Sequence, residues 1–435
     1  MKKGVLAGII ILALVLIVSP GIVGKLGEES LDENLNRAAD QSAELVVTSQ
    51  GFERGWFSSE GEHRIELGDG ELRQMLTMMS DGGGEHPVLI INTKIDHGII
   101  PVTSMSRDHG SLAPGLGSAV STMRLELEDG SSVDIPGEIY SKLALNGDLD
   151  SEYVLEAGST ALDEGTVEWL DANIKIEADA SSGGYGFDGE IGGMVMTEDS
   201  DVMTIGPMSF SGDQEPGEFG YLVGDVDFTM DSVRVVSNGN EAVNMSGLKV
   251  VADNAVDGDR VVGEGSIIVE SMTVPDFGNI AMNIQATSNT DAEALGLLMA
   301  AMDKLPPDAD PSLAMMMAEQ EGKNLFAAGL DFAVPRFDVE LPMGAVEMAM
   351  SFSTPEQDRD AFEWTSLLLK GQASFDMKVP EALVQMATSM NPQAGGIVAM
   401  GYLRKEGDYY VMDADMEQGL LTINGAPIPI PMGAF

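Results

Sequence analysis

The sequence predicts a β-rich α+β protein, in which an N-terminal transmembrane helix is followed by an elongated, mostly antiparallel β-sheet ectodomain with inserted helices. Three observations predict this fold class. Two lysines, Lys2 and Lys3, precede an uncharged stretch from Gly4 to Val23. Most later segments alternate apolar and polar residues, and helical spacing occurs in only a few places. Alternation with a period of two is typical of half-buried antiparallel strands.

The uncharged stretch Gly4–Val23 is the first predicted element. Its length of about 20 residues is what a helix needs to cross a bilayer. Its most apolar part, Val5–Val18, would also suit a signal peptide, but a cleavage after Gly24 would place Ile22 where a small residue is preferred. We therefore expect an uncleaved single-pass anchor. The lysines predict a cytoplasmic N-terminus, with the bulk of the chain in the periplasm.

Four regions follow from these patterns. We assign residues 1–25 to the cytoplasmic tip and anchor, 26–46 to a helical stalk, 47–210 to an N-terminal β-rich part, and 211–435 to a C-terminal β-rich part with helical insertions. Clear alternation predicts strands at Gly51–Leu67, Val88–Ile100, Met123–Asp129, Asn173–Asp179, Val226–Val236, Ser266–Val274, Asn279–Thr287, Arg336–Pro342, Ala345–Ser353, Gln372–Val379, Tyr409–Met416 and Gly419–Gly425. Helical spacing and capping residues predict helices at Asp291–Met302, Pro311–Ala328 and Pro380–Met390.

Composition excludes several classes of function. The chain has 23 basic and 71 acidic residues, a net charge of −48. A chain this acidic repels phosphate backbones, which excludes nucleic acid as a partner. The sequence has no cysteine, so disulfides and thiolate metal sites are excluded. The acidity itself fits adaptation to a halophilic environment, where salt screens self-repulsion, better than cation binding.

Candidate metal sites are few. The four histidines, His63, His86, His97 and His109, lie in one early segment, but their spacing fits no compact helical ligand pair. Asp253, Asp257, Gly258 and Glu264 match four positions of an EF-hand-like calcium loop, yet Ala255 stands where a third ligand is needed and the flanks look like strands. The sequence therefore favours a turn over a calcium site, and no metal or other cofactor is expected.

Methionine is frequent, at 29 residues. Met194 and Met196, like Met348 and Met350, are spaced to share one face of a strand. Such pairs can bind copper(I), but methionine also fills apolar cores, which is the interpretation we favour. The chain has no nucleophile-elbow, phosphate-loop, dinucleotide-binding or zinc-protease motif. We expect a protein that is not an enzyme.

Three segments resemble one family. After the apolar start comes GFERGWFSSEGEHRIEL, then TKIDHGIIPV, and near the end GLLTINGAPIPIP. Together they are similar to the motifs of the YdgA-like (YdgA/YihF) bacterial envelope proteins, although Ile99 stands where the family usually has proline. The residues that carry the resemblance are Gly51, Arg54, Gly55, Trp56, Phe57, Ser58, His97, Gly98, Asn424 and Gly425.

The resemblance implies an inner-membrane-anchored protein that faces the periplasm and has no established biochemical activity. It carries over no catalytic residue, and the shared residues are expected to be structural. The segment around Trp56 also looks like segments of AsmA-like envelope proteins, whose long sheets hold lipid in an apolar groove.

We therefore expect a non-enzymatic envelope protein that binds lipid or another envelope component along a β-sheet groove. Two alternatives stay open: a structural or assembly partner of other envelope proteins, which could form a homo-oligomer, and a metal-dependent periplasmic enzyme that uses the four histidines.

Overall fold

A computed structural model describes residues 45–54, 58–68, 88–97, 115–126, 132–162, 165–198, 200–274, 278–302, 311–390 and 392–428. These residues fall into two compact units. The N-terminal unit ends at Pro216 and also takes in Val236–Gly239, whereas the C-terminal unit comprises Gly217–Val235 and the chain from Asn240 onward.

The N-terminal unit is built of antiparallel strands. Its strands are β1 (Leu45–Arg54), β2 (Ser58–Leu67), β3 (Val88–His97), β4 (Gly115–Glu126), β5 (Ser132–Ala144), β6 (Leu149–Leu155), β7 (Gly158–Leu162), β8 (Gly165–Trp169), β9 (Ala172–Ala178), β10 (Tyr185–Ile191), β11 (Met194–Glu198), β12 (Asp201–Ile205) and β13 (Met208–Pro216). They pair in the order β1-β2-β3-β4-β5-β6-β9-β10-β13, and a second set pairs as β7-β8-β11-β12.

The core of this unit is formed by buried apolar residues of strands such as β3 and β9. In β9 the burial alternates strictly, so that Ile174 and Ile176 point into the core while Lys175 is exposed. Leu89 and Ile90 of β3 have no exposed surface. Tyr153 is also buried, and its hydroxyl donates to the carbonyl of Pro136 at 3.0 Å. Strand β9 is therefore buried on one side only, as its alternation predicts, whereas β3 is buried on both sides at Leu89 and Ile90.

The C-terminal unit is an antiparallel sheet with helices in its connections. Its strands are β14 (Leu222–Ser237, whose last two residues belong to the N-terminal unit), β15 (Asn240–Asp257), β16 (Arg260–Val274), β17 (Gly278–Asp291), β18 (Leu330–Leu341), β19 (Gly344–Thr354), β20 (Gln372–Pro380), β21 (Arg404–Glu406), β22 (Tyr409–Glu417), β23 (Leu420–Ile423) and β24 (Ala426–Ile428). From β15 onward the strands pair in the order β15-β16-β17-β18-β19-β20-β22-β23-β24, with β21 beside the start of β22.

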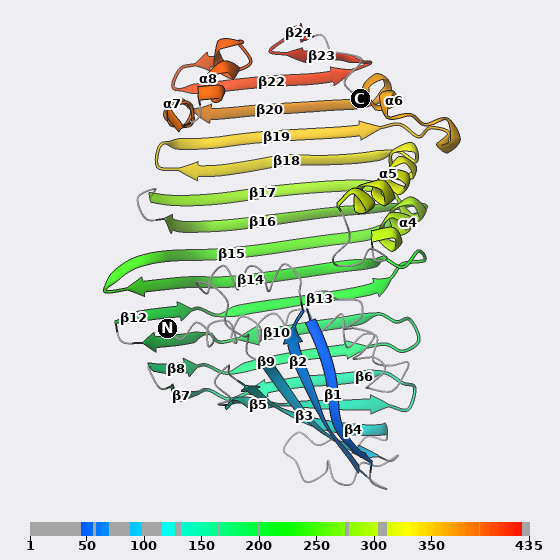
Figure 1. Cartoon of the computed structure of the whole chain (residues 1–435), viewed down its shortest axis with the longest axis vertical. Helices are drawn as coiled ribbons and strands as arrows, with labels where there is room; N and C mark the ends of the chain where they lie inside the picture. Colours follow the sequence, from blue (N-terminus) through cyan, green and yellow to red (C-terminus); the bar gives the residue numbers. More distant parts are fainter. Residues whose placement is uncertain are drawn as a thin grey trace. The chain divides into compact units, whose positions relative to one another are not determined.

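The helices lie at the two ends of these strands. Figure 1 shows α4, α5 and α6 at one end and α7 and α8 at the other. Their bounds are α4 (Ala292–Met302), α5 (Pro311–Ala327), the single 3₁₀ turn η2 (Arg359–Ala361), α6 (Trp364–Lys370), α7 (Glu381–Met390) and α8 (Pro392–Ala399). The three predicted helices are present as α4, α5 and α7, whereas α6 and α8 were not predicted.

The predicted fold class needs one correction. The β-rich, antiparallel architecture is present, but the transmembrane helix is not supported. No helix in the part of the chain that the structure describes is long and apolar enough to cross a membrane. The stretch Gly4–Val23 and most of the predicted stalk, up to residue 44, lie outside the described residues, and Leu45 and Val46 begin strand β1 instead of ending a helix.

Candidate functional site

One side of the C-terminal sheet is apolar across seven neighbouring strands. Cross-strand pairing places one residue of each strand in a continuous row on that side. The row runs from β15 to β22 and consists of Val250, Ile267, Ile284, Phe337, Met348, Met377 and Met412. We call this side of the sheet the apolar face. From Leu248 to Ile423, its paired positions in β15–β20, β22 and β23 hold no Asp, Glu, Lys or Arg.

The opposite side, which we call the polar face, carries the charges. The adjacent row contains Lys249, Ile268, Asn283, Asp338, Glu347, Lys378 and Val411. Charged neighbours pair within it: Lys378 Nζ lies 2.8 Å from Glu347 Oε1, and this hydrogen bond raises the pKa of Lys378. The two faces of one sheet therefore differ sharply in character, which is the pattern of a sheet with one wet and one dry side.

The apolar face is not buried like a core. Within the row, Ile267 is 39% exposed and the other members are half-buried. Phe332 and Met350, elsewhere on the same face, are 36% and 41% exposed. In the N-terminal unit, by contrast, Leu89 and Ile174 are 0% and 2% exposed. A contiguous group of exposed apolar side chains on a protein surface usually marks a binding site.

Helices cover one end of the apolar face. There Val261 of β16 is buried against Tyr221 and Ala292, the first residue of α4. Farther along the same end, the ring of Phe352 lies 6.0 Å from Phe326 of α5, measured between centroids. Trp364 of α6 extends this aromatic cluster, with its ring 5.5 Å from Phe326 and 5.7 Å from Phe362. The open part of the apolar face therefore begins beyond this cluster.

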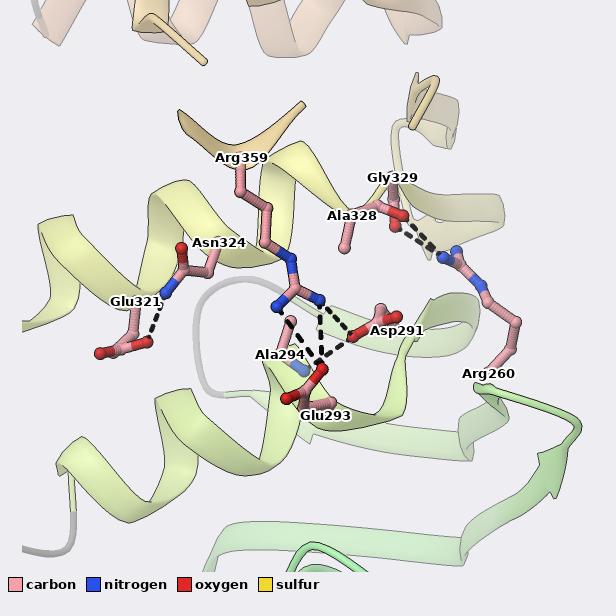
Figure 2. Close-up of polar contacts among 9 residues, drawn as sticks. All are labelled: Arg260, Asp291, Glu293, Ala294, Glu321, Asn324, Ala328, Gly329 and Arg359. Carbon is pink, nitrogen blue, oxygen red and sulfur yellow. Dashed lines mark hydrogen bonds and ion pairs between the residues drawn. The ribbon is translucent and has the colours of Figure 1, made fainter. Parts of the chain in front are cut away.

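Arg260 fastens the helical end to the sheet. Its guanidinium donates to the carbonyls of Ala328 and Gly329, at 3.1 and 2.9 Å, just after α5 ends. It also donates to the side-chain and backbone oxygens of Asn289, at 2.7 and 2.8 Å. Figure 2 shows the side chain reaching the turn that leads into β18. One arginine thus links β16, β17 and the α5–β18 connection.

A second arginine lies beside the start of α4. Arg359 of η2 is 3.5 Å from carboxylate oxygens of both Asp291 and Glu293 (Figure 2). Asp291 also accepts a hydrogen bond of 2.8 Å from the backbone nitrogen of Ala294, which satisfies one free amide in the first helical turn. The ion pairs of Arg359 and the hydrogen bond from Ala294 to Asp291 therefore hold the first turn of α4 in place at the end of β17.

The polar face carries an open hollow of about 530 Å³. Two polar-face rows of β15–β19 line most of it, including Asp253, Glu264, Asp331, Ser351 and Ser353. Among the residues that the structure describes, no group of three or more His, Asp or Glu could hold a metal ion. The hollow is therefore an acidic surface depression with no ligand set for a metal.

The calcium-loop candidate is a β-hairpin. Asp257 pairs with Arg260 across the β15–β16 turn, where Gly258 takes a φ of +66°, and Asp253 faces Glu264 farther along the strands. The helices that flank an EF-hand loop are replaced here by strands.

Of the four histidines, His63 is buried in β2 and His97 is the last residue of β3, while His86 and His109 lie outside the described residues.

The two methionine pairs have different surroundings. Met196 is 4% exposed and belongs to the core of the N-terminal unit, next to half-buried Met194. Met348 and Met350 lie on the apolar face, where Met348 forms a run of three methionines with Met377 and Met412. Unbranched, polarisable methionine side chains adapt to ligands of varied shape.

The first two family motifs meet at one end of a hairpin. Gly51 and Arg54 lie in β1, whose pairing with β2 shifts between Gln50 and Glu53. Ser58 begins β2 opposite Asp96, the residue before His97, in β3. The remaining motif residues of this part, Gly55, Trp56, Phe57 and Gly98, lie outside the described residues.

The third motif is a turn that ties three segments together. Asn424 and Gly425 both have positive φ, 51° and 75°, in the tight turn between β23 and β24. The Asn424 side chain accepts from the backbone nitrogen of Asp413 at 3.1 Å and donates to the carbonyls of Gly401 and Tyr402 at 3.2 and 3.0 Å. These contacts connect the turn to β22 and to the loop after α8.

Neither the contacts of the two arginines nor the apolar row was predicted from the sequence. Alternation was recognised in most strands of the row but not in β15. Arg260 reaches carbonyls 68 and 69 residues away, and no local pattern signals that contact. The methionine-rich strands Ala345–Ser353 and Gln372–Val379 were the available signal for the row.

Comparisons with known proteins give one match. The model of a family described as "Bacterial protein of unknown function (DUF945)" matches residues 1–431. No curated protein and no solved structure matches the chain.

Proposed function

We propose, from the premise that the chain belongs to the DUF945 family of bacterial proteins, that its C-terminal unit binds the acyl chains of lipid along the apolar face. The single observation that carries the proposal is the uncharged and incompletely buried row from Val250 to Met412. The protein would then be a binding protein of the cell envelope and not an enzyme.

The dimensions of the row suit an acyl chain. Seven strands spaced about 4.8 Å apart give a row about 29 Å long. One lipid tail occupies half of a bilayer core of about 30 Å, so it covers roughly 15 Å when extended. The row is therefore long enough for one tail or for two tails placed end to end. Each methylene removed from water contributes about 0.8 kcal/mol, which favours a long apolar ligand.

The chemistry of the apolar face favours lipid over a protein partner. Protein interfaces usually set their register with charged and polar groups at a rim. The paired positions of the apolar face offer no charge, and the sheet ladder already engages the backbone hydrogen-bonding groups of its central strands. A ligand that needs only apolar contact fits this surface best.

The cellular setting is part of the proposal. We propose a periplasmic location of the sheet, which the resemblance of the sequence to envelope proteins implies. Within the family, the finer resemblance to the YdgA-like proteins agrees with an envelope role. The alternatives of a structural partner and of a metal-dependent enzyme have no comparable supporting observation among the described residues.

Lipid that co-purifies with the full chain tests the proposal. Mass spectrometry would quantify bound lipid for the wild type, for Met350→Glu on the apolar face, and for Ser351→Glu on the polar face. Both positions are exposed, and Ser351→Glu gives up a 2.7 Å hydrogen bond between the hydroxyls of Ser351 and Ser374, so the free energy of unfolding of each variant should lie within about 1.5 kcal/mol of the wild type. We expect Met350→Glu to lower bound lipid about tenfold or more, because a carboxylate facing an acyl chain loses its hydration, and Ser351→Glu to leave it unchanged.

Equal lipid in Met350→Glu and the wild type would overturn the proposal, as would the absence of lipid from all three proteins. Stoichiometric zinc without lipid would instead point to the enzyme alternative.

A further inference from the structure

We infer that the bound lipid has an uncharged or zwitterionic headgroup, so that the protein discriminates against anionic lipids. This inference rests on the proposed function and adds the class of ligand. The cations of the C-terminal unit carry it, because an anionic headgroup needs an available Lys or Arg as its partner.

The cations on the sheet are already engaged by carboxylates. On the polar face Lys249 pairs with Asp227 at 3.2 Å, Arg336 with Asp338 at 2.6 Å and Lys378 with Glu347 at 2.8 Å. All three also point to the side of the sheet away from the apolar face. None of them is placed to meet a headgroup whose tail lies on the apolar face.

The cations at the strand ends are engaged as well. Arg359 lies between Asp291 and Glu293, and Lys405 pairs with Glu381 at 2.6 Å. The Lys405 hydrogen bond lowers the pKa of Glu381, which keeps that carboxylate charged and its partner occupied. The guanidinium of Arg260 donates hydrogen bonds to backbone carbonyls and to the side-chain amide oxygen of Asn289, near the end of α5.

Lys370, at the C-terminal end of α6, differs from these residues. Its side chain forms no ion pair or hydrogen bond with the described residues of this unit, and the residue is exposed. A single exposed lysine adds little affinity for a phosphate, because water and salt screen the contact. Lys370 therefore does not by itself make an anion site.

The carboxylates add repulsion of the same sign. Asp253, Glu264 and Asp331 gather on the polar face, on the far side of a single sheet, and the whole chain carries −48. At low salt, several carboxylates about 10 Å from an anionic headgroup amount to roughly a tenfold preference for a headgroup without net charge. Salt weakens the repulsion, but it supplies no cationic partner, and the described residues of this unit offer only Lys370.

A competition experiment tests the inference. The full chain is incubated with vesicles of equal parts phosphatidylethanolamine and phosphatidylglycerol with identical acyl chains, reisolated, and its bound lipid is quantified by mass spectrometry. We expect phosphatidylethanolamine to exceed phosphatidylglycerol about tenfold at low salt and to stay in excess at 150 mM salt. The variant Lys370→Gln should keep the ratio within about twofold.

The outcomes separate this inference from the proposed function. Equal binding or an excess of phosphatidylglycerol overturns the headgroup inference while lipid binding itself stands. Absence of both lipids overturns the proposed function and the inference with it. A loss of phosphatidylglycerol binding in Lys370→Gln would likewise overturn the inference, since it would reveal an anion site.

Discussion

Replacing Arg260 with alanine should loosen the helical end of the C-terminal sheet. Arg260 makes four hydrogen bonds with β17 and with the connection between α5 and β18. Two of them end on the carbonyls of Ala328 and Gly329, directly after α5. Removing the side chain therefore weakens the attachment of the end of α5 to β16 and β17, although the hydrogen bond from Thr354 to the carbonyl of Phe326 stays.

The magnitude follows from the type of bond. A hydrogen bond from a charged donor contributes about 1.5–3 kcal/mol, but contributions from one side chain are not additive. The site is half-buried, so water replaces part of what is lost. We estimate a cost of about 3 kcal/mol for local opening, which corresponds to amide exchange roughly a hundredfold faster.

Hydrogen exchange on the full chain measures this effect by segment. Peptides that cover α4 and α5 should exchange about a hundredfold faster in Arg260→Ala, while peptides that cover β22 should stay unchanged. Arg260→Lys should resemble the alanine variant, because an ammonium cannot reproduce the planar fork that reaches all four oxygens.

Arg336→Ala is the matched control. Arg336 is on the same sheet, but it is exposed and pairs only with Asp338 in the contacts given for the described residues. Loss of such an exposed pair costs about 0–1 kcal/mol, so exchange should change less than about fivefold. If Arg260→Ala changed amide exchange at α4 and α5 no more than Arg336→Ala does, the interpretation that Arg260 holds the end of α5 to the sheet would be refuted.

Two further predictions concern the whole chain and the N-terminal unit. Because the net charge is −48, the melting temperature should rise with the concentration of sodium chloride. It should not respond to micromolar calcium at constant ionic strength. A calcium-specific rise of several degrees would contradict the interpretation of Asp253, Asp257 and Glu264 as solvated carboxylates. Burial raises the pKa of Tyr153 to about 12, so its contribution to stability is complete below about pH 10 and is lost as the pH rises toward 12. Urea unfolding at pH 9 and pH 11 should show a smaller loss of stability for Tyr153→Phe than for the wild type, and an equal loss in both would contradict this prediction.

Local signals in the sequence predicted many of the elements. Pro311 and Pro380 mark the starts of α5 and α7, because proline suits the first helical turn, and both helices lie close to their predicted bounds. Alternation located most of the strands that form the C-terminal sheet, but it did not identify β15, the longest of them, or the short strands β21 and β24. The helix α8 escaped prediction because Gly395 and Gly396 weaken its helical pattern. The short α6 begins at Trp364, and the residue before it, Glu363, makes no side-chain capping hydrogen bond, so the sequence has no capping residue from which its start could be predicted.

The site could be predicted only in part, because it depends on register. Alternation shows that Met348 and Met350 share one face of β19, but it does not reveal which residue of β20 lies opposite. The pairing of Met348 with Met377, and of Met377 with Met412, joins strands separated by helices and loops. These connecting segments influence which residues of the two strands lie opposite each other. That register cannot be deduced from the lengths of the segments alone.

The two units show that one sequence pattern can have two physical outcomes. Strand β9 alternates apolar and polar residues, and its apolar residues, such as Ile174 and Ile176, are fully buried. Strands β16 and β19 alternate in the same way, yet Ile267 and Met350 stay about two-fifths exposed. Alternation specifies which side of a strand avoids water, but a second layer is needed to complete the burial. In the described part of the C-terminal unit the helices α4, α5 and α6 supply that layer at one end of the strands, and beyond them the apolar side chains stay accessible to a ligand. The position at which the helical layer ends is therefore the structural feature that converts an ordinary amphipathic sheet into a candidate lipid-binding surface.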